Sequence, residues 1–119
     1  MKIPGPDHPI TVAPATKHVV VRYDGEIVAD THRALVLKEA SYPAVYYVPR
    51  SDADMSHFAP TEHHTTCPYK GEARYFSLVG GGGRAENAVW SYETPFPAVG
   101  DIREHLAFYP DKVEIEVGD

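Results

Sequence analysis

Residues 18–29 read HVVVRYDGEIVA, and this stretch is the clearest guide to the fold. β-Branched side chains dominate residues 18–23 and reappear in residues 26–29, as is typical of two paired strands. Between them, Asp24 and Gly25 suit a two-residue hairpin turn, because both turn positions need a positive φ that glycine adopts freely and aspartate tolerates. The sequence therefore predicts an antiparallel hairpin here.

The rest of the chain repeats this pattern of short strands separated by turn residues. Residues 33–39 (RALVLKE) mix helix-forming residues with a two-residue alternation, and we favour a strand because a proline follows soon after. The four glycines at 80–83 predict a turn between the strands on either side of them. Further strands are expected at residues 44–48, 73–79, 87–92 and 112–117. In the last of these, Val113, Ile115 and Val117 should point inward.

Two long segments lack a strand pattern. Residues 50–66 are polar and rich in Asp, His and Thr, which predicts a loop with at most one helical turn. Residues 100–107 follow two prolines and are expected to form a short helix.

Length and strand spacing set the domain organisation. A chain of 119 residues fits one domain with one core. Eleven prolines leave few windows for a long helix, and about seven short strands suggest a mainly β protein, a sandwich or a coiled, barrel-like sheet. Residues 1–16 hold four of the prolines and are expected to form an extended arm, with residues 17–119 as the single β domain.

The composition excludes several classes of partner. A net charge of −6 and the lack of any basic run argue against nucleic acid. No apolar stretch approaches the roughly 20 residues of a membrane-spanning helix, so no membrane partner is expected. Residues 1–6 (MKIPGP) lack the apolar core of a signal peptide, and the single cysteine, Cys67, allows neither an internal disulfide nor a four-cysteine zinc site. We therefore expect a cytoplasmic protein, monomeric or homodimeric.

The densest group of reactive side chains is residues 63–71, HHTTCPYKG. A thiol becomes nucleophilic when its pKa falls, and Lys70, three positions after Cys67, or a nearby histidine can lower it. Pro68 and Gly71 indicate a tight turn that would hold both side chains on one side, so Cys67 and Lys70 are the catalytic candidates. The alternative is that Cys67 is a small buried apolar residue and Lys70 a solvated turn residue.

Within this segment, residues 66–75 (TCPYKGEARY) resemble the signature of a family named domain of unknown function 427, which is also labelled nucleotidyltransferase-like. The resemblance covers nearly all of the chain from Arg22 onward. It continues in the blocks at residues 28–30 (VAD), 33–35 (RAL), 45–50 (VYYVPR), 88–92 (AVWSY) and 107–109 (AFY). It implies a compact, strongly coiled β domain akin to the β-tent folds, and no particular activity. β-Tent folds often carry a structural zinc on paired cysteines, which this chain lacks, so no cofactor is expected.

Polar side chains at the family's motif positions are the candidates for a pocket. Beside the two catalytic candidates, the ligand-binding candidates are Arg22, Glu39, Tyr47, Tyr69, Tyr75, Trp90 and Tyr92. The alternative for each aromatic residue is packing in the core or on a sheet face, and for Arg22 with Glu39 it is a cross-strand ion pair.

The nucleotidyltransferase label finds no support in the residues. Such enzymes hold Mg²⁺ on carboxylates, often a close Asp pair on a strand after a Gly-Ser turn, whereas Asp52 and Asp54 lie in a polar segment without that turn. The glycines at 80–83 have only Arg84 as a neighbouring cation, so a hairpin tip is favoured over a phosphate-binding loop.

A transition-metal site is a further alternative, because the imidazoles of His57, His63 and His64 and the thiolate of Cys67 suit Zn²⁺ or Cu²⁺. Adjacent residues of a strand point to opposite faces, so at most one of His63 and His64 would join such a site. We assign no metal.

The sequence is compatible with two functions from different classes. The first is a domain that binds or acts on a small molecule at a pocket around residues 67–71 (CPYKG). The second is a non-catalytic protein-interaction module with a tyrosine-rich face, which the eight tyrosines would supply.

Overall fold

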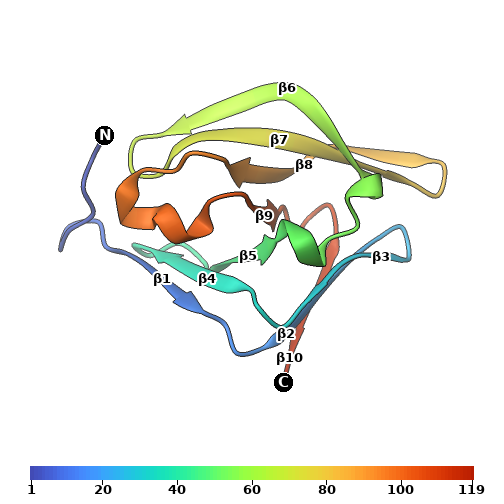
Figure 1. Ribbon diagram of the computed structural model, residues 1–119, viewed down its shortest axis with the longest axis horizontal. Coiled ribbons are helices and arrows are strands. Elements are labelled where there is room, and N and C mark those ends of the chain that lie inside the picture. The colour runs from blue at the N-terminus through green and yellow to red at the C-terminus, as the bar shows by residue number, and fades with distance from the viewer.

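Ten strands, all paired antiparallel, make up most of the protein (Figure 1). The computed structural model describes all residues 1–119. The strands are β1 (Ile10–Pro14), β2 (His18–Tyr23), β3 (Glu26–Thr31), β4 (Leu35–Glu39), β5 (Val45–Pro49), β6 (Phe58–Cys67), β7 (Gly71–Gly80), β8 (Gly83–Tyr92), β9 (His105–Phe108) and β10 (Glu114–Gly118). Three short 3₁₀ helices accompany them: η1 (Arg50–Asp52), η2 (Met55–His57) and η3 (Pro97–Ile102). None of these helices has the length and apolar character that crossing a membrane requires.

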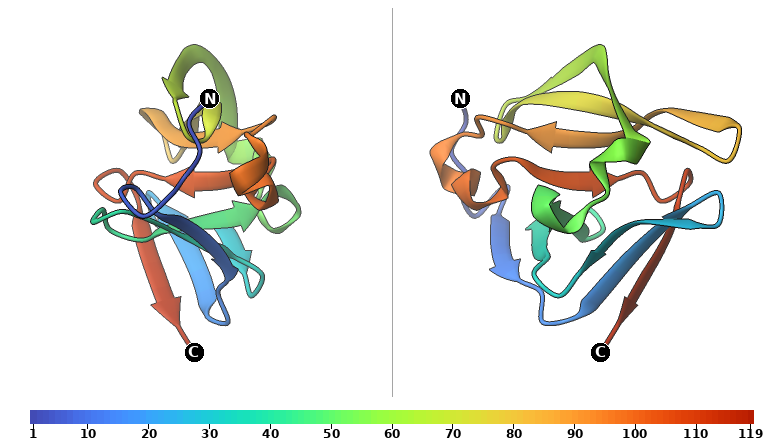
Figure 2. Two further views of the ribbon diagram at one scale, coloured as in Figure 1. Left: turned by 90° about the vertical axis from the view of Figure 1, so that its left-hand side faces the viewer. Right: turned by 45° about the vertical axis from the view of Figure 1, so that its right-hand side comes forward.

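The strands form two sheets. Seven strands make the larger sheet, in the order β1-β4-β5-β9-β8-β7-β6, and three make the smaller one, in the order β10-β2-β3. Figure 2 shows β6, β7 and β8 on one side of the molecule and the small sheet on the other, with β4, β5 and β9 between them. The predicted mainly β, single-domain fold is confirmed, although the sheets do not close into a barrel.

Both predicted hairpin turns are present, and their tips meet. In the β2–β3 turn Asp24 and Gly25 have φ values of 52° and 80°, and in the β7–β8 turn Gly81 and Gly82 have values of 56° and 85°. A Cβ atom on Gly81 would lie 1.7 Å from Asp24 Oδ2, so position 81 requires glycine for its conformation and also for its lack of a side chain. This contact joins the small sheet to the large one where Figure 1 shows both tips on the same side.

The strands expected at residues 33–39, 44–48, 73–79, 87–92 and 112–117 are present as β4, β5, β7, β8 and β10. The side chains expected to point inward from β10 are less buried than predicted, because Ile115 is only partly buried and Val117 is 40% exposed. β10 is an edge strand of the small sheet, so little of the protein covers it. Within residues 1–16, Ile10–Pro14 forms β1, which pairs with β4 at the opposite edge of the large sheet from β6.

Two predictions between the strands are wrong. Residues 50–66 are not a loop, because residues 58–67 form the ten-residue β6. β6 is an edge strand with most side chains exposed, so no alternation of apolar and polar residues reveals it. The helix expected at residues 100–107 is also wrong, since η3 lies earlier and β9 begins at His105. Glu104, with a φ of 59°, separates the helical turns from the strand.

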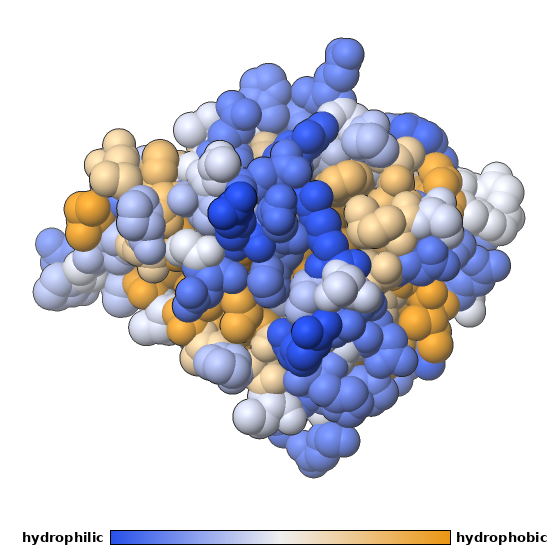
Figure 3. Space-filling view, in the orientation of Figure 1, coloured by the Kyte–Doolittle hydropathy of each residue, from blue (hydrophilic) through white to orange (hydrophobic).

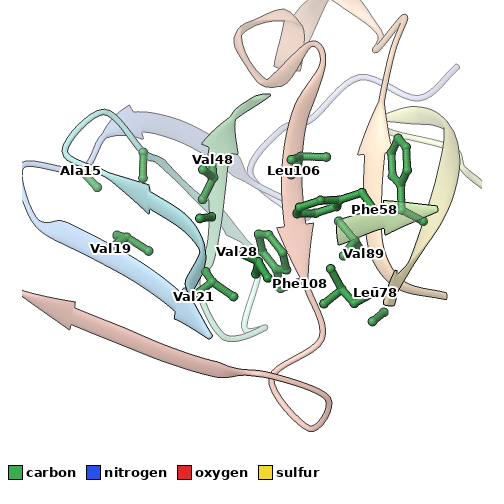
Figure 4. Packing of buried hydrophobic residues seen from close by; sticks show 14 residues of the cluster. Ala15, Val19, Val21, Val28, Val48, Phe58, Leu78, Val89, Leu106 and Phe108 are labelled. Atoms are coloured by element: carbon green, nitrogen blue, oxygen red, sulfur yellow. The ribbon is translucent and has the colours of Figure 1, made fainter. Parts of the chain in front are cut away.

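The core has two parts. In the first, Phe58 contacts Phe76 and Phe108 edge to face, with ring centroids 6.2 and 6.0 Å apart. Val19 and Val21 of β2 belong to the same buried cluster, which Figure 4 shows extending from β2 to Phe58 and Phe108. The second part includes three buried tyrosines, Tyr47, Tyr75 and Tyr92. These tyrosines bring hydroxyl groups into the interior, where each hydroxyl needs a partner or water.

Candidate functional site

A cavity of about 240 Å³ opens in the large sheet beside the second part of the core. We call it the tyrosine cavity. Eleven residues line it, and six of them are candidates from the sequence: Glu39, Tyr47, Lys70, Tyr75, Trp90 and Tyr92. The remaining lining residues are Leu37, Tyr42, Pro43, Val45 and Tyr109.

The two-residue period of the strands explains why these side chains converge. In β4 and β5, Val45 lies opposite Leu37, so the alternate residues Leu37 and Glu39 share one face of the sheet with Val45 and Tyr47. In β7 and β8, Tyr75 lies directly opposite Trp90 in the same way. Most of the cavity wall is therefore built on strands, whose side-chain directions are fixed by the sheet.

The polar end of the tyrosine cavity is an ion pair. Lys70 Nζ contacts Glu39 Oε1, and the two side chains are 12% and 14% exposed. His8 Nε2 lies 2.7 Å from the second carboxylate oxygen of Glu39. Burial opposes the ionisation of Glu39, but the hydrogen bonds from Lys70 and His8 outweigh it and hold the pKa of this carboxyl below its usual value. Glu39 is therefore a carboxylate held between two basic side chains.

The turn from β6 to β7 places Lys70 at this end of the cavity. Cys67 lies opposite Gly71 at the base of the turn, and Gly71 has a φ of 112°. The carbonyl of Lys70 accepts a hydrogen bond of 2.9 Å from the amide of Phe96, which fixes the backbone just before Gly71. The turn is thus ordered by backbone contacts, and its lysine side chain extends to β4.

The N-terminal residues cover this turn. The imidazole of His8 stacks on the ring of Tyr69, with centroids 4.1 Å apart and planes 7° from parallel. The amide of Lys2 donates a 2.7 Å hydrogen bond to the carbonyl of Pro68, and Lys2 Nζ lies 5.9 Å from the centre of the Tyr69 ring. Tyr69 thus contacts the N-terminal segment and does not line the cavity.

The aromatic wall carries hydroxyl groups. Trp90 Nε1 donates a 3.3 Å hydrogen bond to the hydroxyl of Tyr47, and the hydroxyls of Tyr75 and Tyr109 lie 3.3 Å apart. Burial raises the pKa of Tyr47 and of Tyr92 well above the usual tyrosine value, and burial with the Tyr75 hydrogen bond raises the pKa of Tyr109 to about 12. These hydroxyls therefore stay protonated at neutral pH and can donate hydrogen bonds.

Three sequence candidates lie elsewhere. Arg22 of β2 contacts Glu116 of β10, so the ion pair considered between Arg22 and Glu39 does not form. Cys67 is half-buried against the second part of the core, and no hydrogen bond joins it to Lys70. Together with Tyr69, which contacts the N-terminal segment, these residues fall outside the lining of the tyrosine cavity.

Among the residues at the cavity that the sequence did not single out are Tyr109 and His8. Tyr109 follows Ala107 by two residues, and Ala107 lies opposite Trp90, so a two-residue period starting from β9 would have found it. His8 has no such signal, because 31 residues of chain separate it from Glu39.

Most of the aspartate and histidine side chains that we considered as metal ligands make hydrogen bonds within the protein. Asp52 accepts hydrogen bonds from Thr31 and Arg33, and Asp54 accepts one from the amide of Ser56 at the start of η2. His57 Nδ1 lies 2.9 Å from the carbonyl of Val79. No three His, Cys, Asp or Glu side chains are grouped as metal ligands would be.

Comparison with known families gives one result. A family model described as Domain of unknown function (DUF427) matches residues 11–119, which confirms the resemblance seen in the sequence. No curated protein matches the chain. The match takes in every residue that lines the tyrosine cavity, whereas His8 lies outside it.

Proposed function

The chain belongs to the domain of unknown function 427 family, and we propose that it is a small-molecule binding domain whose site is the tyrosine cavity. A ligand would place a polar group against Lys70 and Glu39 and an apolar body against Trp90 and the tyrosine rings. Such a combination of apolar walls with a few convergent polar groups is the usual composition of a ligand site.

The observation that carries this proposal is the ion pair of Lys70 and Glu39 at the wall of a cavity. Taking two charges out of water is costly, and a buried ion pair is often no more stabilising than an apolar pair of the same size. With side chains only 12% and 14% exposed, the pair is largely desolvated, yet it borders open space and not packed core. A polar group of a ligand can occupy that space and use the charges.

Burial of the tyrosines disfavours the alternative of a tyrosine-rich docking face. Tyr47, Tyr75 and Tyr92 are 1%, 5% and 5% exposed, so they cannot contact a protein partner without rearrangement. On the face drawn in Figure 3, hydrophilic residues form a central band with apolar residues on both sides of it. The most exposed large apolar side chains come from four parts of the chain: Met1 and Ile3 at the N-terminus, Ile27, Tyr42 and Val117.

The test uses the dye anilinonaphthalenesulfonate, which has an aromatic body and an anionic head. Trp90 is the only tryptophan of the chain and lines the tyrosine cavity, so dye bound there should quench Trp90 emission, and the variants below test whether this cavity is the site. We expect saturable dye binding to the folded protein with quenching of Trp90 emission. Lys70→Met should weaken that binding by about tenfold, because it removes the ammonium group near the anionic head.

Lys17→Met is the matched control, since Lys17 is half-exposed and contacts Asp119 away from the cavity. The control should bind the dye as the wild type does. Equal losses in the two variants, or dye binding that leaves Trp90 emission unchanged, would refute the proposed site.

A further inference from the structure

The tyrosine cavity adjoins a second, larger cavity of about 520 Å³. The two cavities share five lining residues: Glu39, Tyr42, Pro43, Val45 and Trp90. Beyond these, the second cavity is lined by residues such as Phe108, Pro110 and Ile115, which lead towards β10 of the small sheet. We call it the apolar cavity, because Glu39, at the boundary with the tyrosine cavity, is its one charged lining residue.

The groups left free at the polar end are mainly hydrogen-bond donors. An ammonium group has three N–H donors, and the single hydrogen bond of Lys70 Nζ is to Glu39. The Tyr47 hydroxyl accepts from Trp90 and keeps its own O–H free, and the Tyr92 hydroxyl makes no hydrogen bond within the protein. Both oxygens of Glu39 are already engaged, one by Lys70 and the other by His8. The free groups therefore call for a ligand rich in acceptor oxygens.

Charge points the same way. The carboxylate of Glu39 lies between two basic side chains, Lys70 and His8, so one acidic group is shared by two basic ones. An anionic group on the ligand would supply a second acidic partner. A carboxylate supplies two acceptor oxygens and one negative charge, which matches the donors and the charge together.

We propose that the two cavities together bind an amphiphilic monocarboxylic acid, with its carboxylate on Lys70 and the tyrosine hydroxyls and its apolar chain in the apolar cavity. This inference rests on the proposed function and names the chemical class of its ligand. The loop between β4 and β5, which contains Tyr42 and Pro43, lies where the head group and the chain of the ligand would join.

The first experiment measures dissociation constants by calorimetry for straight-chain carboxylates from butyrate to dodecanoate, with decanol as the neutral analogue. Each added methylene should strengthen binding about fourfold for as long as it enters the apolar cavity, the factor that its transfer from water predicts. Decanol should bind at least about tenfold more weakly than decanoate, because it lacks the charge. Decanoate should also displace anilinonaphthalenesulfonate.

The second experiment separates the head of the ligand from its chain by mutation. Lys70→Met should weaken decanoate about tenfold and leave decanol unchanged. Ala44 is exposed and lines the apolar cavity but not the tyrosine cavity. Ala44→Asp should therefore weaken the binding of decanoate and hardly change the binding of butyrate. Ser41→Asp places the same charge on the same loop outside both cavities and should bind decanoate as the wild type does.

The outcomes distinguish this inference from the proposed function. If the dye binds at Trp90 but decanoate neither binds nor displaces it, the ligand class is wrong and the binding site stands. Equal affinities for decanol and decanoate overturn the carboxylate assignment, and affinities that do not change with chain length overturn the apolar cavity as the site of the chain. If neither dye nor decanoate binds, both proposals fail.

Discussion

Trp90 Nε1 donates a hydrogen bond to the hydroxyl of Tyr47 although β9 lies between their strands in the sheet. The rings meet edge to face, with centroids 6.4 Å apart and planes at 90°. Ala107 of β9 lies opposite Trp90, and β5 pairs with β9 through Val48 and Leu106, the sequence neighbours of Tyr47 and Ala107. A methyl side chain at position 107 thus leaves the two larger residues room to meet above it.

Tyr47→Phe removes the acceptor of this hydrogen bond and little else. We expect a loss of about 1 kcal/mol in the free energy of unfolding, measured by urea denaturation, since a hydrogen bond between neutral groups contributes about that much. Tyr42→Phe is the control, because Tyr42 is 60% exposed and its hydroxyl makes no hydrogen bond, so its stability should match that of the wild type. Equal stabilities of the two variants would show that the Tyr47 hydroxyl contributes nothing.

The low pKa of Glu39 predicts an acid-sensitive part of the stability. A carboxyl whose pKa is lower in the folded than in the unfolded state stabilises the fold above its unfolded value of about 4.3, and this stabilisation is lost as the pH falls through the folded pKa. Glu39→Gln should therefore be less stable than the wild type at neutral pH, and the difference should shrink below about pH 4.3. Melting temperatures of both proteins across that range measure it.

Lys70→Met should also make the melting temperature depend less on pH in the acid range, because Lys70 supplies one of the hydrogen bonds that lower the pKa of Glu39. A constant difference between the wild type and Glu39→Gln at every pH would contradict the role assigned to this ion pair.

The sequence predicts the hairpins through the local chemistry of their turns, whereas its six candidates that line the cavity come from the family's motif positions. A two-residue period places Tyr75 and Trp90 on a common face once they are paired, but their pairing also depends on a register shift between Phe76 and Leu78 that the turn does not specify. The edge strand β6 lacks such a signal, since its exposed side chains show no alternation.

Local sequence patterns do not predict contacts between segments that are distant in the chain. Ile10 lies opposite Glu39 in the β1–β4 pairing, which brings His8 next to the carboxylate, and no local pattern predicts that β1 pairs with β4. Arg22 meets Glu116 for the same kind of reason, because β10 pairs with β2 at the edge of the small sheet. Each contact depends on strand order, which is a property of the whole fold.

The raised pKa values of the cavity tyrosines predict a loss of stability at high pH. A tyrosine that is harder to ionise in the folded state stabilises the fold fully below its unfolded pKa of about 10, and this stabilisation is lost as the pH rises beyond it. Burial is the main cause of the raised pKa of Tyr92, so Tyr92→Phe should flatten the fall in melting temperature above about pH 10. Tyr42→Phe, at the exposed position, should leave that fall as steep as in the wild type.

The contact between the hairpin tips predicts unequal effects at neighbouring glycines. Gly81→Ala and Gly82→Ala each force alanine into a positive φ, which should destabilise the protein by about 1 kcal/mol. Only at position 81 does the new methyl group also meet Asp24, so Gly81→Ala should be the less stable variant in urea denaturation. Adding Asp24→Gly to Gly81→Ala should remove the excess, because glycine removes the side chain and keeps the positive φ of position 24. Equal stabilities of the two single variants would indicate that the tips can separate without loss.

The last prediction concerns the thiol of Cys67 and the ammonium of Lys70. The ammonium group contacts Glu39, and its charge is largely compensated there, so it should have little effect on the thiol. We expect Lys70→Met to change the rate of alkylation of Cys67 by less than about twofold, and half-burial to make the wild-type thiol react more slowly than free cysteine. Iodoacetamide labelling followed by mass spectrometry measures both rates, and Lys17→Met serves as the control for loss of a positive charge. A roughly tenfold slower reaction in Lys70→Met alone would mean that Lys70 promotes the thiolate, because a nearby positive charge lowers a thiol pKa. That result would support the pairing of Cys67 with Lys70 that the sequence suggests.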